Sequence, residues 1–241
     1  MIAVTFALPA ESADFLRRLT NKTRIERNSG EVICGEIDHR RIEVLHTGVG
    51  EKACRERLAK FLSTTGRIRR GEQEQRLDYL ISAGFAGALN DQLQPGDLLL
   101  AKNFSTIRLR EKFSLSSLPL HIADLLTVPA LIHSPEERNK LALTSGAAAV
   151  DMETEFIARA CAAQGIPLLS IRVISDTPRE LFPAPADVLF DIKRQQTRML
   201  KLATHLLTHP SRVPRLVQFA KRIACARKTL ANALVEVVRN L

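Results

Sequence analysis

The sequence predicts an α/β protein in which helices cover both faces of a mixed, mostly parallel central sheet. Short apolar runs alternate with segments of helical periodicity along most of the 241 residues, which is the pattern of a three-layer αβα architecture. The apolar runs at 32–37 and 42–46 are close enough to form an early hairpin. A chain of this length can bury a sizeable core in one such domain.

Eight apolar runs predict strands, and four periodic segments predict helices. The strands are expected at residues 2–7, 32–37, 42–46, 79–82, 97–101, 127–132, 147–150 and 168–174, and the helices at residues 10–19, 51–63, 153–163 and 186–207. Gly165 and Pro167 are helix-ending residues that close the third of these helices. The polar segment 66–76 is expected to be a surface loop, and residues 102–126 show no regular pattern.

The composition argues against several classes of protein. The hydrophobic fraction of 45% is ordinary for a globular chain, and no apolar run reaches transmembrane length. Residues 1–8 lack the basic start of a signal peptide, so they are interpreted as a first strand. The four cysteines have no paired spacing, which favours a reducing cytoplasm and argues against a zinc site or a disulfide framework.

The formal charge of +9 is concentrated at the C-terminal end of the chain. Residues 212–241 hold seven Arg and Lys residues against Glu236 alone. No aromatic residues accompany these basic residues in a cluster, so nucleic acid is not expected as a partner.

The same C-terminal segment carries an apolar stripe at helical spacing. Its members are Leu216, Ala220, Ile223, Leu230, Leu234, Val237 and Leu241. One interpretation is a helix packed on the body or across a dimer, and the other is a basic amphipathic element that lies on an anionic membrane. We therefore expect a catalytic domain at 1–208 and a basic, helical C-terminal extension at 209–241.

Two acidic motifs follow predicted strands. Val150-Asp-Met-Glu153 presents a carboxylate at the start of a helix, and Ser175-Asp176 follows the strand at 168–174, at the strand end where open α/β sheets bind ligands. Two acids presented in this way suit cleavage of a bond through a cationic, sugar-like transition state. The alternative is that both acids cap a helix or a turn.

Two glycine motifs follow other predicted strands. Gly48-Val-Gly50-Glu-Lys-Ala53 fits the dinucleotide fingerprint in form, but the acidic residue expected about 20 positions later is missing, so no nicotinamide cofactor is expected. Ser82-Ala-Gly-Phe-Ala-Gly87 follows the strand that begins at Tyr79. Its glycines permit a close approach of the backbone to a ligand, and the alternative is a tight turn from a strand to a helix.

Six motifs taken together resemble the purine nucleoside phosphorylase and nucleosidase superfamily. They are Leu8-Pro-Ala-Glu11, Thr47-Gly-Val-Gly50, Ser82-Ala-Gly-Phe-Ala-Gly87, Pro95-Gly-Asp97, Val150-Asp-Met-Glu153 and Ser175-Asp176, in the order seen in that family. The resemblance covers residues 1–208 and is strongest to the methylthioadenosine/S-adenosylhomocysteine nucleosidase branch and its hopanoid-associated relatives. It implies a nucleoside phosphorylase-like fold and a purine nucleoside as substrate, without a metal or another cofactor.

The resemblance also implies roles for individual residues. Asp176 would protonate or hydrogen-bond N7 of the leaving purine, and Glu11 would orient or deprotonate the attacking water. Glu153 would bind the ribose hydroxyls while Met152 packs on the ribose. Ser82 and Gly84 would line the site near the nucleophile, and Phe85 and Ser175 complete the substrate-binding set. The nearest candidate for a base-stacking position is the segment Leu131 to His133.

The nucleophile is open between water and phosphate. Phosphate requires cationic or amide donors, whereas the first loop offers Glu11 and Asp14, whose charge would repel it. Hydrolysis is therefore favoured over phosphorolysis. A third possibility is a family member that binds a nucleoside without catalysis. Relatives suggest a homo-oligomer of at least two subunits.

Overall fold

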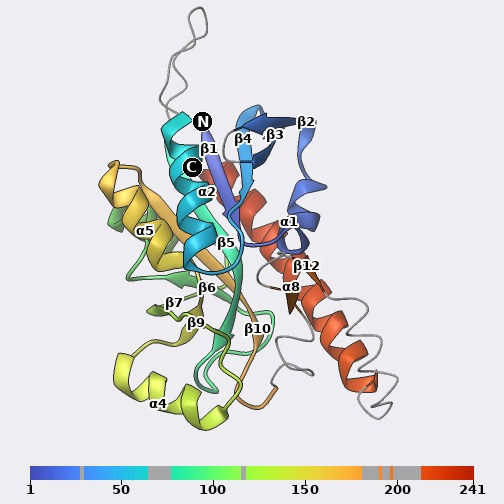
Figure 1. Cartoon of the computed structure of the whole chain (residues 1–241), viewed down its shortest axis with the longest axis vertical. Coiled ribbons are helices and arrows are strands. Elements are labelled where there is room, and N and C mark those ends of the chain that lie inside the picture. Colours follow the sequence, from blue (N-terminus) through green and yellow to red (C-terminus); the bar gives the residue numbers. More distant parts are fainter. Residues whose placement is uncertain (28–29, 65–76, 115–117, 181–189, 192–195, 198–212) are drawn as a thin grey trace, which may run out of the picture.

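The fold is a ten-stranded mixed sheet covered by helices on both faces (Figure 1). The computed structural model describes residues 1–27, 30–64, 77–114, 118–180, 190–191, 196–197 and 213–241. The strands are β1 (Ile2–Phe6), β2 (Thr20–Arg27), β3 (Gly30–Ile37), β4 (Arg40–His46), β5 (Tyr79–Ala88), β6 (Leu98–Ala101), β7 (Leu120–Ala123), β8 (Leu125–Thr127), β9 (Ala149–Asp151) and β10 (Leu168–Asp176). The helices are α1 (Pro9–Leu16), α2 (Glu51–Thr64), α3 (Ile107–Ser114), α4 (Pro135–Ser145), α5 (Thr154–Ala163) and α8 (Val213–Asn240).

The centre of the sheet is parallel, and the edge formed by β2, β3 and β4 is antiparallel. The strand order is β2-β3-β4-β1-β5-β10-β6-β7, and β9 pairs with both β5 and β8. Strands β4, β1, β5 and β10 run parallel to one another, whereas β2, β3 and β4 form antiparallel pairs. The central strands therefore end at one edge of the sheet, where open α/β sheets bind ligands. The predicted three-layer fold and the early hairpin are confirmed.

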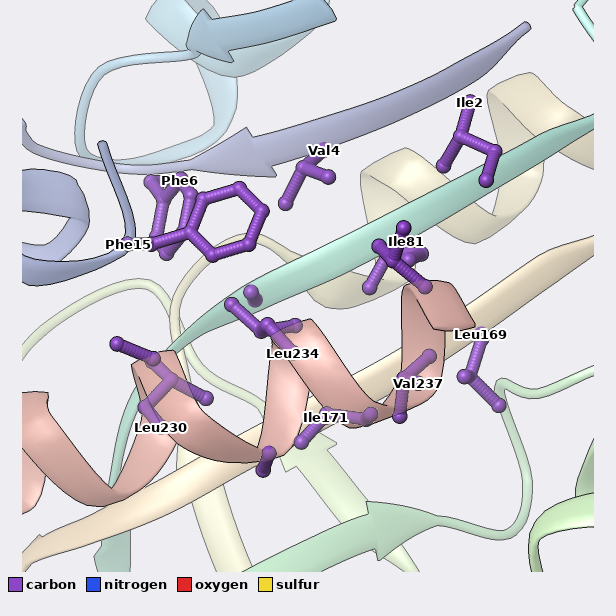
Figure 2. Packing of buried hydrophobic residues seen from close by; sticks show 14 of the residues in the cluster. Ile2, Val4, Phe6, Phe15, Ile81, Leu169, Ile171, Leu230, Leu234 and Val237 are labelled. Carbon is purple, nitrogen blue, oxygen red and sulfur yellow. The ribbon is translucent and has the colours of Figure 1, made fainter. Parts of the chain in front are cut away.

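Each face of the sheet has its own hydrophobic core. Alternate residues of β1, β5 and β10 pack against α1, α3 and α8 on one face, and the residues between them pack against α2 and α5 on the other. Figure 2 shows Leu230, Leu234 and Val237 of α8 facing the apolar side chains of the three strands. Strands buried on both faces have nearly continuous apolar sequences, which is why these strands were predictable.

Helix α8 uses its apolar stripe inside the protein. Leu230, Leu234 and Val237 are each 0% exposed, while Val217 in the first half of the helix is 48% exposed. Of the two interpretations of the C-terminal stripe, packing on the body is the one that the second half of α8 adopts. The expected boundary at 208/209 lies outside the described residues. No helix in the described part of the chain is long and apolar enough to span a membrane.

Some sequence predictions were wrong in position or length. The strand expected at 127–132 ends at Thr127, because β8 spans Leu125–Thr127. Strand β5 runs on to Ala88 and contains the whole Ser82–Gly87 motif, which is therefore not a turn. The expected helix at 186–207 lies mostly outside the described residues, and its described residues form the antiparallel pair β11 (Phe190–Asp191) and β12 (Gln196–Thr197) instead. The loop expected at 66–76 lies outside the described residues.

The packing of α8 predicts a large loss of stability on truncation of its core residues. Leu234→Ala should lower the free energy of unfolding by about 2–5 kcal/mol, because it removes a buried side chain and leaves a cavity. Val217→Ala on the same helix should change it by no more than about 0.5 kcal/mol. Urea denaturation of both variants checks the prediction, and equal small effects would show that α8 is not part of the core.

Candidate active site

The predicted site residues come together at the carboxyl ends of the central strands. Glu11 follows β1, Gly50 follows β4, Glu153 follows β9, and Asp176 ends β10. β5 passes between them, with Gly84 paired to Arg172 and Gly87 paired to Asp176 across the β5–β10 ladder. The sheet thus gathers residues that are up to 165 positions apart in the sequence.

Glu11 is held against β5 by backbone hydrogen bonds. Its Oε1 accepts from the N–H of Phe85 at 3.2 Å and its Oε2 from the N–H of Leu8 at 3.0 Å. A Cβ atom on Gly84 would lie 3.3 Å from Oε1, so glycine makes room for the carboxylate. Burial raises the pKa of Glu11, and the two backbone bonds partly oppose that shift. A carboxylate with a raised pKa is better suited to accept a proton from water than an ordinary one.

Glu153 lies at the start of α5 and faces the glycine-rich turn after β4. Its Oε1 accepts from the N–H of Gly50 at 2.8 Å, so the turn that formally matched a dinucleotide fingerprint holds a carboxylate instead. Burial, then the negative charges of Asp151 and Glu11, raise the pKa of Glu153 to about 8, against the effect of Arg172 and the Gly50 bond. Glu153 is therefore poised to hold or release a proton near neutral pH.

Arg172 is the central cation of the site, and sequence reasoning missed it. It is 3% exposed, and its Nε and Nη2 donate to Asp151 Oδ2 at 3.1 and 3.0 Å. Its Nη2 also donates to the hydroxyl of Ser82 at 2.8 Å, and its Nη1 donates to the carbonyl of Ser82 at 2.8 Å. One sequence signal could have revealed Arg172, namely its position as a charged residue within a continuous apolar strand. A charge buried in this way requires a partner.

Asp151 completes this cluster from the end of β9. Besides Arg172, it accepts hydrogen bonds from the N–H and the hydroxyl of Thr154, and from the hydroxyl of Thr127 at 2.8 Å. Thr154 also accepts a bond from Arg172 Nη2 at 2.5 Å. Asp151 thus fixes the first turn of α5, which carries Glu153 at its start. The expectation of a capping role for an acid is met by Asp151 rather than by Glu153, whose side chain makes no cap hydrogen bond.

Asp176 ends β10 and pairs with Gly87, three residues after Gly84 on β5. The β5–β10 register shifts between Ile174 and Asp176, and such bulges re-aim side chains next to active sites. Asp176 is 1% exposed and forms an ion pair with Arg138 of α4. The hydroxyl of Ser175 donates to Asp176 Oδ1 at 2.5 Å. Neither the ion pair nor Arg138 itself was expected from the sequence.

The other predicted residues occupy the same region. Met152 is 9% exposed between Asp151 and Glu153, and Ser82 is 1% exposed beneath Arg172. In the segment proposed for base stacking, Leu131 is 40% exposed, while the Ile132 carbonyl accepts two hydrogen bonds from Arg138. The described residues contain no group of His, Cys, Asp and Glu side chains arranged to hold a metal ion.

A contact between Ser12 and the partly buried His46 supports the first turn of α1, which carries Glu11. Ser12 Oγ and His46 Nε2 lie 2.7 Å apart, and Ser12 Oγ also donates to the Pro9 carbonyl at 3.1 Å. Burial lowers the pKa of His46 to about 4, so the imidazole is neutral at physiological pH. This histidine joins the end of β4 to α1 without adding a positive charge near the site.

Sequence comparison assigns the chain to a family. The model of the phosphorylase superfamily matches residues 1–112 and 108–208. The chain belongs to this superfamily. No curated protein sequence matches it at a significant level. This match confirms the family that the six sequence motifs resemble.

Solved structures of this superfamily share the fold over the full chain. The 5′-methylthioadenosine/S-adenosylhomocysteine nucleosidase of Campylobacter jejuni is 18% identical with a TM-score of 0.71, covering 100% of this chain and 99% of its own. A Borrelia burgdorferi B31 protein assigned to the same class and bound to adenine is 18% identical, with a TM-score of 0.73 and full coverage of both chains. Futalosine hydrolase of Helicobacter pylori is 17% identical, with a TM-score of 0.72 and coverage of 100% and 97%.

The raised pKa of Glu153 predicts a pH-dependent loss of stability. Its ordinary pKa of 4.5 rises to about 8 in the folded protein, so between these values the folded state keeps a proton that the unfolded state releases. The free energy of unfolding should therefore fall as pH rises through this window, by at most about 1.4 kcal/mol per pH unit for one proton. Glu153→Gln should make the decline shallower.

Urea denaturation of the wild type and Glu153→Gln at a series of pH values from 5 to about 8 measures this difference. Parallel stability profiles for the two proteins would show that Glu153 does not keep its proton on folding.

Proposed function

We propose that this chain cleaves the N-glycosidic bond of a purine nucleoside, with an adenosine-type base and a 5′ substituent, and with water as the nucleophile. The observation that carries the proposal is the arrangement of two acidic centres along β5. Glu11 contacts Gly84, and Asp176 lies beside Gly87. Gly84 and Gly87 lie roughly 10 Å apart along an extended strand, a length comparable to that of a nucleoside, and the register shift before Asp176 re-aims its side chain.

On this basis we assign one centre to the sugar and the other to the base. Asp176 would protonate or hydrogen-bond N7 as the C1′–N9 bond breaks and its electrons move to the purine. Water would then add its oxygen to C1′ and give a proton to Glu11. Glu153 would bind the ribose hydroxyls, with Met152 against the ribose. An oxocarbenium-like sugar carries positive charge, which the surrounding carboxylates stabilise.

The remaining predicted residues take supporting roles in this scheme. Ser82 and Gly84 would line the nucleophile side of the site, while Phe85 holds Glu11 through its N–H. Ser175 would act on the base side through its bond to Asp176. We add Arg172 and Asp151 to this set, because their ion pair fixes Ser82 and the start of α5.

The charges near the site favour water over phosphate. Arg138 and Arg172 are the two buried arginines in the described part of the chain, and both are engaged by protein acceptors. His46 is neutral at physiological pH, and Glu11 in its ionised form would repel an anion. The names of the similar structures are those of nucleosidases and a hydrolase. Phosphorolysis and binding without catalysis are the alternatives.

The proposed reaction predicts base release without phosphate. Adenosine, methylthioadenosine, S-adenosylhomocysteine, futalosine and inosine should be incubated with the protein in phosphate-free buffer and again with phosphate, and the free base measured by chromatography. We expect release from at least one 5′-substituted substrate at the same rate in both buffers. Release that requires phosphate would establish a phosphorylase, and no release from any substrate would favour a binding protein.

The role of Asp176 predicts a large catalytic defect on its replacement. Asp176→Asn should lower kcat for base release by about 100-fold or more, because an amide cannot supply the proton that a general acid supplies. Asp38→Asn provides a matched control, since Asp38 pairs with Arg239 at the exposed surface. Steady-state kinetics with the best substrate decide the point, and unchanged turnover in Asp176→Asn would remove Asp176 from the mechanism.

We also infer a homo-oligomeric protein of the cytoplasm that can touch the inner membrane surface. The cysteines of the chain are free thiols, as a reducing compartment allows. Membrane contact would involve the first half of α8, where Val217 is exposed and where Lys221 adds positive charge. Co-sedimentation with anionic liposomes at low salt tests this contact, and a protein that stays in the supernatant would exclude it.

A further inference from the structure

Arg138 attaches α4 to the base side of the site. It is the buried residue of that helix, at 2% exposure, and an arginine is seldom buried without a partner. Leu141 and Ala142 pack only partly against the small cluster that contains Ile132. A cavity of about 410 Å³ lined by Asn90, Pro135 and Pro178 opens beside the first turn of α4. The docking of α4 therefore depends strongly on Arg138.

The guanidinium of Arg138 is almost fully used by the protein. Nε and Nη2 donate to the Ile132 carbonyl at 3.2 and 3.0 Å, Nη1 donates to the Ala88 carbonyl at 2.9 Å, and Nη2 also donates to Asp176 Oδ2. Four of the five N–H donors of an arginine are thus engaged. A residue saturated in this way orients its neighbours and has little capacity left to bind a ligand.

The strand beside this ion pair leaves room for it. A Cβ atom on Gly87 would lie 3.1 Å from Arg138 Nη1 and 3.1 Å from Asp176 Oδ2. Any larger residue would push the two charged groups aside. The glycine of β5, the bulge in β10 and the arginine of α4 therefore fit one another.

The ion pair distinguishes the two oxygens of Asp176. Oδ2 is taken by Arg138, whereas Oδ1 accepts from the Ser175 hydroxyl. Ser175 Oγ also lies 3.2 Å from the Ala86 carbonyl, so its single proton can turn to that carbonyl when Oδ1 carries a proton. Oδ1 is thus the oxygen that can exchange a proton or a hydrogen bond with a bound base.

We propose that Arg138 is a positioning residue of the leaving-group site, which holds Asp176 through Oδ2, leaves Oδ1 for the base, and ties the orientation of Asp176 to the docking of α4. The proposal rests on the proposed function for the identity of the base. Arg138 does not touch the substrate in this account, and the base is released productively only while α4 is docked.

The test compares leaving groups that do and do not need Asp176. Arg138→Met should lower kcat for purine release by about 100-fold, the scale expected when a reacting group is misplaced by about 1 Å, with KM changed less than about threefold on the same argument. Turnover of 4-nitrophenyl riboside should change less than about threefold, because nitrophenolate leaves without a proton. Equal losses on both substrates, or no loss on either, would overturn the proposal.

Lys140→Met is the matched control, since Lys140 is an exposed cation on the same helix. It should match the wild type on both substrates. A loss of purine release in Lys140→Met as large as in Arg138→Met would overturn the proposal, because a general effect of charge on α4 would then suffice.

Hydrogen exchange of residues 135–145 tests the coupling of α4 to Asp176 independently of the proposed function. If the wild type releases nothing from either substrate, the proposed function fails and exchange decides alone. Arg138→Met and Asp176→Asn should both accelerate exchange in this segment, while Lys140→Met should not, because only the first two break the ion pair. Unchanged exchange in Arg138→Met would contradict the coupling of α4 to Asp176.

Discussion

The active end of this protein depends on the burial of one guanidinium, that of Arg172. Transfer of an arginine from water into a core is unfavourable unless its donors are satisfied. Here the ring of acceptors includes Asp151, Ser82 and Thr154, which come from β9, β5 and α5. Asp151 extends the network to β8 through Thr127. One cation thus fixes the relative positions of the elements that carry the site.

This network also sets the electrostatics around the nucleophile. Glu11 is buried and Glu153 is partly buried near Arg172, yet desolvation raises the pKa of each despite that cation. Because Arg172 forms an ion pair with Asp151, the negative charge of Asp151 largely offsets the attraction of Arg172 for Glu11 and Glu153. The site therefore combines carboxyl groups of raised pKa with little free positive charge, as the cationic sugar and neutral nucleophile of the proposed reaction require.

The second buried arginine gives the proposed base side a similar construction. Arg138 and Asp176 form an ion pair whose remaining donors contact the carbonyls of Ala88 and Ile132. The two centres differ in their supports, because Arg172 belongs to the sheet whereas Arg138 belongs to a surface helix. The proposed sugar side is accordingly supported by the sheet itself, and the proposed base side by the docking of α4.

Local patterns predicted most of the fold but only part of the site. The central strands were predictable because they are apolar on both faces, and Glu11, Glu153 and Asp176 because they stand in motifs next to strand ends. α4 was missed, since its polar sequence shows weak helical periodicity, and α3 lies in the segment 102–126, for which no regular pattern was recognised. Arg172 and Arg138 were missed because each partner is distant in sequence: Asp151 lies 21 residues from Arg172, and Asp176 lies 38 residues from Arg138. Partners of this kind are fixed by sheet topology, which no local pattern reveals.

The origin of the oxygen in the sugar product tests the central claim most directly. The protein should be incubated with S-adenosylhomocysteine or methylthioadenosine in ¹⁸O-labelled water containing phosphate, and the mass of the released sugar determined. Hydrolysis predicts a free sugar whose new C1′ hydroxyl carries one ¹⁸O atom. A sugar 1-phosphate without the label, or recovery of intact nucleoside, would contradict the account.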